Sequence, residues 1–173
     1  EDHLALMRGA DGFVFELWQE VDGPYSGPTS GWDRDYGIYL NTPTGSVQMN
    51  TTIVGNQTNP TMAILANGNM VVAWQSPDAS GTGVVFRILD PEGQPILGER
   101  WANRTTAGNQ SSPNLVALAD GTFLILWTSA GTDGSGAGIY GQRVGADGSL
   151  YLGAEFRLNA TTVAMWNQLR RVF

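Results

Sequence analysis

Hydrophobic residues in this chain gather in short runs that are separated by glycine-rich polar segments. The run at 69–74, Asn-Met-Val-Val-Ala-Trp, is almost uniformly apolar, and so is Thr-Phe-Leu-Ile-Leu-Trp at 122–127. Short apolar runs between turn signals are typical of strands with both faces buried. The run at 138–144, Gly-Ile-Tyr-Gly-Gln-Arg-Val, alternates between its two faces, as strands do. The pattern therefore predicts β-strands along most of the chain.

The turns between these runs place a glycine after Asn or Asp. The Asn-Gly at 67–68 and the Asp-Gly at 120–121 each predict a two-residue hairpin turn, because glycine accepts a positive φ without a steric cost. A further strand is predicted at 154–159. Only residues 162–173 show a trace of helical period; they are interpreted as the start of a further unit, with a short terminal helix as the alternative.

The same order of landmarks occurs three times along the chain. Trp18, Trp74 and Trp127 each end an apolar run, and they lie 56 and 53 residues apart. Their regular, apolar setting predicts that they pack in the core. Each Trp is followed by a Gly-Ile-Tyr-like strand, a turn and a closing Asn. The closing residues are Asn50, Asn103 and Asn159.

A four-stranded repeat of about 50 residues predicts an all-β, single repeat domain over residues 1–173. Its units span approximately 1–54, 55–107 and 108–166, and the tail at 167–173 begins a fourth unit or docks on a neighbour. Propeller-like blades are the favoured arrangement, and a β-trefoil, a β-solenoid or another sandwich is the alternative. Three blades cannot close a propeller. The chain is therefore expected to belong to a longer array, to pair with a second chain or to dock head to tail.

The motif order resembles a known class of repeat. It reads Gly-Asn-Gln-Ser-Ser-Pro at 108–113, Leu-Ala-Asp-Gly at 118–121, then Trp127, Gly-Ile-Tyr-Gly-Gln-Arg at 138–143 and Asp-Gly at 147–148. Similar tandem repeats, which look like propeller blades, are found in large bacterial surface and secreted proteins. The resemblance covers units two and three well, and unit one only through its Trp and Tyr-Gly-Ile-Tyr. It implies an extracellular or cell-surface location, a non-enzymatic role and no catalytic residues to carry over.

Composition narrows the possible partners. A net charge of −7 and a pI near 4.4 disfavour nucleic acid and anionic membranes, and no apolar run is long enough for membrane insertion. The absence of cysteine excludes disulfides and Cys-ligated metals. The chain has one histidine, His3, around which no Ser-His-Asp triad can be assembled. These features predict that the chain is not an enzyme, with a hydrolase as the least favoured interpretation.

Two sets of side chains are candidate ligand contacts. Asp33, Asp35 and Asp133 lie in Gly-rich loops and are weak calcium candidates, because calcium takes six or more oxygen ligands. No other cofactor is expected. Aromatic residues that break the repeat are candidates for stacking on sugar rings or for contacts between subunits. These aromatic residues are Tyr25, Trp32, Trp101, Tyr151 and Trp166.

Five Asn-x-Ser/Thr sequons occur at repeat positions. Their side chains are expected to bond turn backbone rather than to carry the glycans that such sequons can accept in secreted proteins. The sequons begin at Asn50, Asn56, Asn103, Asn109 and Asn159.

The favoured function is a structural or adhesive module that assembles with copies of itself or with neighbouring modules, into a surface array or a filament. Exposed strand edges invite such association, and residues 1–12 and 162–173 are its expected carriers. The alternative is a carbohydrate-binding, lectin-like module that contacts glycans through Trp32 and Trp101 and neighbouring amides.

Overall fold

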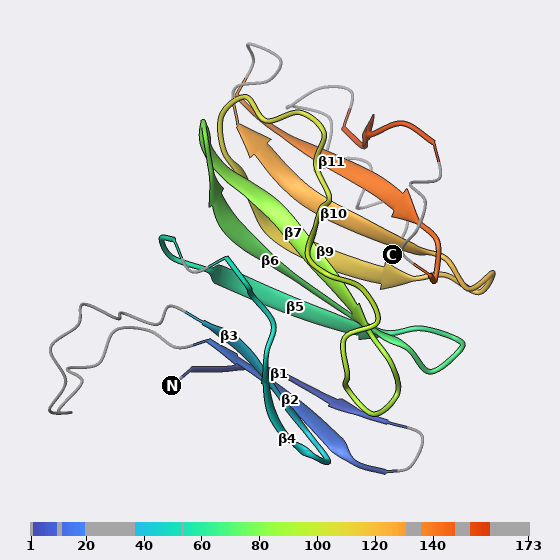
Figure 1. The fold of residues 1–173 in the computed structure, drawn as a ribbon. Coiled ribbons are helices and arrows are strands. Elements are labelled where there is room, and N and C mark those ends of the chain that lie inside the picture. The colour runs from blue at the N-terminus through green and yellow to red at the C-terminus, as the bar shows by residue number, and fades with distance from the viewer. Residues whose placement is uncertain are drawn as a thin grey trace, which may run out of the picture.

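The computed structural model describes residues 2–9, 12–19, 37–52, 54–130, 136–147 and 153–159. These residues form three antiparallel sheets of four strands, each built from strands that follow one another along the chain (Figure 1). Sheet one contains β1 (Asp2–Arg8), β2 (Val14–Gln19), β3 (Ile38–Thr42) and β4 (Gly45–Gln48). Sheet two contains β5 (Thr58–Ile64), β6 (Met70–Asp78), β7 (Gly81–Leu89) and β8 (Arg100–Trp101). Sheet three contains β9 (Gln110–Ala117), β10 (Phe123–Ala130), β11 (Ala137–Val144) and β12 (Phe156–Arg157).

The prediction of an all-β fold with three four-stranded units is confirmed. The trefoil alternative is not what the strands form, because within the described ranges no strand is shared between sheets and no barrel closes. The three sheets by themselves do not close a propeller ring either. None of the described segments forms a helix long and apolar enough to cross a membrane.

The three sheets stack face to face, with sheet two in the middle (Figure 1). We call the side of each sheet that carries the repeated Trp its front face, and the opposite side its rear face. The rear face of sheet one packs on the front face of sheet two, where Phe15, Leu17 and Leu40 meet Val72 and Trp74. The rear face of sheet two packs on the front face of sheet three in the same way. Each contact removes a continuous apolar layer from water, which is the main stabilising contribution.

Two of the three repeated Trp side chains lie in these layers. Trp74 is 0% exposed and Trp127 is 2% exposed, so their predicted core packing is confirmed. Trp18 is half-buried on the front face of sheet one and stacks on Tyr39, with ring centroids 4.5 Å apart. No other described sheet packs on that face, which explains why Trp18 retains exposure.

The β5–β6 and β9–β10 hairpins differ from the predicted two-residue turns. In the first, Leu65 N–H donates to the Asn69 carbonyl at 2.7 Å and Gly68 N–H donates to the Leu65 carbonyl at 2.9 Å. The loop is therefore three residues long and ends at a glycine in the left-handed region, with φ of 86° at Gly68 and 84° at Gly121. This is a type I turn followed by a bulge. The predicted role of the glycine is correct, but the predicted loop length is wrong.

The prediction that both faces of the second strand are buried is correct for β6 and wrong for β10. Val71 and Ala73 on the rear face of β6 are fully buried against sheet three. Leu124 and Leu126 hold the same positions in β10 but are only half-buried. The reason is that no described sheet covers the rear face of sheet three, whereas sheet three covers the rear face of sheet two. Of the strand predicted at 154–159, only Phe156–Arg157 is paired.

Candidate functional site

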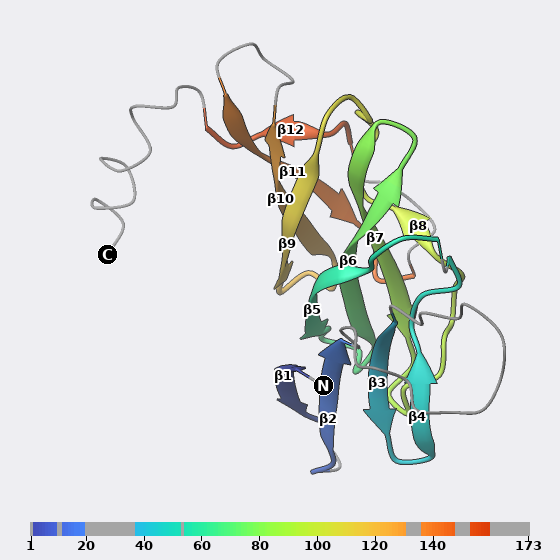
Figure 2. The same ribbon diagram turned by 90° about the vertical axis from the view of Figure 1, so that its left-hand side faces the viewer.

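The strands that carry the repeated Trp end at one edge of the molecule, where the first strand of each sheet begins. Gln19, Gln75 and Thr128 directly follow the three Trp residues at this end. Figure 2 shows β1, β5 and β9 following one another along one side of the stack. The stacking therefore brings polar residues from three distant segments to one edge. We call it the amide edge, and it comprises Gln19, Thr58, Asn59, Gln75, Ser111, Ser112 and Thr128.

One hydrogen bond joins sheets one and two across the amide edge, and a second links Asn59 to Gln75 within sheet two. The Gln19 side-chain oxygen Oε1 accepts from the Asn59 backbone N–H at 3.3 Å. The Asn59 side chain donates through Nδ2 to Gln75 Oε1 at 3.1 Å. Asn59 is exposed, and both glutamines are half-buried. Gln19 thus holds the backbone of Asn59, and Gln75 holds its exposed side-chain amide.

Backbone irregularities in β5 and β9 present these residues. Asn59 and Ser112 both have φ of 53°, in the left-handed region that few residues other than glycine and Asn adopt. Each lies at a register shift in the pairing of its strand with the next one. Bulges of this kind change the direction of a side chain, and they are frequent next to functional sites. In sheet three, Ser111 lies opposite Thr128, as Thr58 lies opposite Gln75 in sheet two.

The chemistry of the amide edge is neutral and rich in hydrogen-bonding groups. An amide side chain offers two donor hydrogens and an acceptor oxygen, and a hydroxyl group offers both functions. Gln19 and Gln75 use Oε1, while no acceptor for either Nε2 is found in the described part of the chain. Such groups suit a ligand that carries many hydroxyls. This set of residues was not predicted from the sequence, although a polar residue follows each repeated Trp.

Asp78 is a carboxylate at the same end of sheet two, at the tip of β6. Its Oδ1 accepts from the Ser80 N–H at 2.8 Å, whereas Oδ2 is buried with no hydrogen-bond partner in the described structure. The adjoining hairpin packs on sheet three, because Thr82 forms a parallel bridge with Asn109. Within the described ranges, no three His, Cys, Asp or Glu side chains lie close enough together to hold a metal ion. The calcium candidates Asp33, Asp35 and Asp133 lie outside the described residues.

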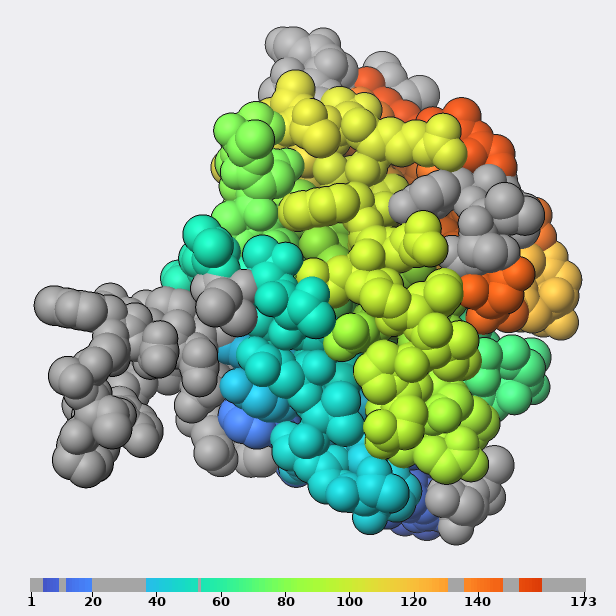
Figure 3. All heavy atoms as spheres, viewed as in Figure 1, coloured from blue at the N-terminus to red at the C-terminus, as the bar shows by residue number. Residues whose placement is uncertain are grey.

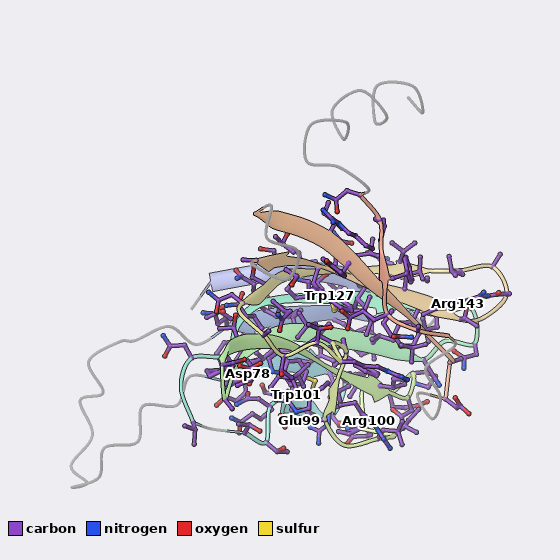
Figure 4. The ribbon with its side chains drawn as sticks, turned by 90° about the horizontal axis from the view of Figure 1, so that it is seen from above. Asp78, Glu99, Arg100, Trp101, Trp127 and Arg143 are labelled. Atoms are coloured by element: carbon purple, nitrogen blue, oxygen red, sulfur yellow. The ribbon has the colours of Figure 1, made fainter. Side chains whose placement is uncertain are left out.

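Trp101 is the one aromatic candidate that falls within the described ranges. It is 43% exposed and lies on the outer strand β8, labelled in Figure 4 beside Glu99 and Arg100. Its ring covers Gly83, where a Cβ atom would come within 2.6 Å of Trp101 Cζ3. Three strand spacings, roughly 14 Å, separate β8 from β5, so Trp101 is not part of the amide edge. The candidates Tyr25, Trp32, Tyr151 and Trp166 lie outside the described residues.

The closing Asn of each unit has a structural role. Asn50 Oδ1 accepts from Ile38 N–H at 2.8 Å, Asn103 Oδ1 from Val84 N–H at 2.8 Å and Asn159 Oδ1 from Ile139 N–H at 2.7 Å. All three are buried, while the sequon residues Asn56 and Asn109 are exposed. Each closing Asn ties the loop after the fourth strand to the start of the third strand.

No family model and no curated protein matches the chain. Among solved structures, it resembles an endo-arabinase from Bacteroides thetaiotaomicron VPI-5482, with 14% identity and a TM-score of 0.52 over 90% of this chain and 61% of that one. It also resembles an endo-1,4-β-xylanase from the same organism, with 12% identity and a TM-score of 0.54 over 88% of this chain and 59% of that one. The chain thus spans about 60% of the length of either enzyme.

These similarities correct the prediction that the chain has no enzymatic role. Both similar structures are enzymes, an endo-arabinase and an endo-xylanase, so this fold occurs in enzymes named for polysaccharide substrates. The prediction relied on the lone histidine, on the resemblance to surface repeats and on the spacing of the acidic residues, in which no carboxylate pair for glycoside cleavage stands out. Spacing along the chain does not determine which carboxylates lie close together in the fold. At 12–14% identity the similarity establishes a shared fold. It fits the carbohydrate-binding alternative better than the structural or adhesive prediction.

Proposed function

We propose that this chain binds polysaccharide at the amide edge, with polymers of the arabinan or xylan class as its ligands. The observation that carries the proposal is the convergence of Gln19, Asn59 and Gln75 at one edge of a fold shared with an endo-arabinase and an endo-xylanase. A few polar groups placed on a rigid scaffold are the usual means of orienting a ligand. Here, paired β-strands supply the rigid scaffold.

The test measures binding of linear arabinan and xylan by calorimetry, with dextran as the comparison polymer. The double variant Asn59→Gly/Gln75→Ala removes two amides, and Gly fits the positive φ at residue 59. We expect the affinity to fall roughly five- to 150-fold, because each of the two lost hydrogen bonds contributes about 0.5–1.5 kcal/mol. The control is Asn67→Ser, in the β5–β6 hairpin at the opposite end of sheet two, which should bind as the natural protein does.

Two outcomes would count against this assignment: no binding of either pentose polymer, or equal affinity of the double variant and the natural protein. Release of reducing sugar from the same polymers, measured in parallel, reports whether the chain also cleaves what it binds. Asp78, whose Oδ2 is buried and unpartnered among the described residues, is the residue to replace if cleavage is observed. Asp78→Asn would then abolish sugar release if the carboxylate takes part in cleavage.

A further inference from the structure

The rear face of sheet three carries the apolar residues that the other two sheets bury. In sheet one this face presents Phe15, Leu17, Ile38, Leu40 and Met49, and in sheet two it presents Val71, Ala73, Val84, Phe86 and Ala102; all ten are buried. The pairing registers place Leu124, Leu126, Ile139, Gly141 and Leu158 at the same positions in sheet three. Leu158 is 48% exposed, whereas Ala102 at the equivalent position is 0% exposed.

Further side chains complete this face. Phe156, 39% exposed, lies over Gly141, where a Cβ atom would come within 3.0 Å of Phe156 Cζ. A phenyl ring thus covers the position that Phe86 occupies in sheet two. The polar residues on this face include Asn114 of β9, which lies opposite Leu126, and Arg143, which replaces Ile88 and is paired with Asp120. Thr122 hydrogen bonds, followed by the Arg143 charge, lower the pKa of Asp120. In sheet one, Thr42 holds the position that Arg143 occupies in sheet three and is buried, so this position accommodates polar side chains.

A second repeated contact marks each junction between sheets. Glu99 of sheet two accepts hydrogen bonds from the backbone N–H groups of Thr51 and Thr52 in the loop that follows sheet one, and Figure 3 shows these two segments side by side on one face. Glu155 of sheet three likewise accepts from Arg104 N–H at 2.7 Å and Thr105 N–H at 3.2 Å after sheet two. Both loops begin with Asn-x-Thr, at 50–52 after sheet one and at 103–105 after sheet two, and the same sequence occurs again at 159–161.

We propose that the rear face of sheet three docks a further four-stranded sheet of this repeat, one that has an apolar front face and a Glu four residues before its closing Asn. The new junction resembles the two that the structure already contains, in its apolar composition and in the Asn-x-Thr loop beside it. The proposal does not rest on polysaccharide binding, because Gln19, Asn59 and Gln75, which carry that function, lie on sheets one and two, whereas the docking face lies on sheet three.

Sheet one of a second copy does not meet this description. Its front face has Glu16, bonded to Asn41 at 2.9 Å, where units two and three have Val72 and Ile125. Docking would bury that carboxylate against leucine side chains, at a cost of several kcal/mol. Unit one also has Ser46 four residues before Asn50, so it lacks the glutamate that the loop at 159–161 requires. The occupant is therefore a unit like two or three.

The test appends a second copy of residues 108–159 to the C-terminus of the full chain. The longer connection costs little, because loop-closure entropy grows slowly with length. We expect one cooperative unfolding transition at a higher denaturant midpoint than that of the natural chain, since neighbouring repeats stabilise one another. Exchange of the backbone amides of residues 160 and 161 should slow at least tenfold, and Glu155→Ala in the appended copy should reverse that protection.

The matched pair of variants places the same change on two faces. Leu126→Asp in the original unit three should remove the gain in midpoint, whereas Leu126→Asp in the appended copy, on a face that stays uncovered, should leave most of it. Independent unfolding of the appended copy, with amides 160 and 161 unprotected, would overturn the proposal. Dimers of the natural chain in sedimentation, if both Val14→Asp and Leu126→Asp disrupt them, would also overturn it, because sheet one would then be the occupant.

Discussion

At the scale of the residue, one position of the repeat occurs in two hydrogen-bonding states. Trp74 donates through Nε1 to Gln57 Oε1 at 3.1 Å, and both side chains are fully buried. Trp127 occupies the same position in sheet three, but its buried Nε1 has no partner in the described structure. Gln110, the equivalent of Gln57, instead accepts from Asn103 Nδ2 at 3.0 Å. The two equivalent Trp residues thus share the buried packing of the indole ring but not its hydrogen bond.

This difference predicts unequal effects of the same substitution. Trp74→Phe removes the donor and leaves the buried Gln57 oxygen without a partner, whereas Trp127→Phe removes a donor that is already unpartnered. Both variants lose similar ring volume, so the hydrogen bond should dominate the difference. We expect Trp74→Phe to lower the free energy of unfolding by about 1–3 kcal/mol more than Trp127→Phe, measured by urea denaturation. Equal losses would mean that Gln57 finds another donor.

At the scale of the element, the hairpins depend on a residue in the left-handed region. In the β9–β10 hairpin, Gly121 has φ of 84° and its N–H donates to the Leu118 carbonyl at 3.1 Å. A Cβ atom on Gly121 would meet no other atom within 4 Å. A substitution there therefore tests backbone conformation alone, free of side-chain clashes.

Gly121→Ala should destabilise the protein by about 1–2 kcal/mol, because a left-handed conformation costs an L-residue roughly that much. Gly98 is the matched control: it also has open space around a Cβ, but its backbone lies outside the left-handed region. Gly98→Ala should therefore change stability little or raise it slightly. Thermal denaturation monitored by circular dichroism distinguishes the two variants, and similar melting temperatures would show that the hairpin adapts to alanine.

At the scale of the whole molecule, stability comes from contacts between sheets. Each sheet contributes one or two apolar faces to the layers that hold the stack together. Glu99 adds a polar contact beside the layer between sheets one and two, where its Oε2 accepts a hydrogen bond from Thr52 Oγ1 at 3.0 Å. This glutamate joins sheet two to the loop after sheet one, so its removal weakens the junction without opening a cavity in either apolar layer.

Glu99→Ala should lower the free energy of unfolding by about 1 kcal/mol, which is below the roughly 1.5–3 kcal/mol typical of hydrogen bonds to a charged group because the contact is exposed. Faster hydrogen exchange at the Thr51 and Thr52 amides should accompany the loss. Glu92, an exposed glutamate in the β7–β8 turn, is the control, and Glu92→Ala should leave both amides unchanged. Unchanged exchange in Glu99→Ala would show that Glu99 does not stabilise the junction.

The sequence by itself determined the strands, the repeat and much of the core. The apolar run that ends in Trp74 predicts a strand with both faces buried, because such a strand needs apolar residues at every position. The similar run that ends in Trp127 predicts the strand, but only one of its faces is fully buried. The hairpin glycines could be predicted because Asn-Gly and Asp-Gly are local turn signals. The length of the hairpin loop could not be predicted, because it depends on which backbone groups pair. All of these features are set by neighbours close in sequence.

Only the tertiary structure decided which distant residues meet. Gln19 and Asn59 are 40 residues apart and bond because sheet one stacks on sheet two in register, and Leu126 differs from Ala73 in burial because no described sheet covers it. The hydrophobic pattern of a single strand does not determine which sheet will pack against it. The amide edge and the exposed rear face arise from the stacking of whole sheets, and for that physical reason neither could be predicted from local sequence.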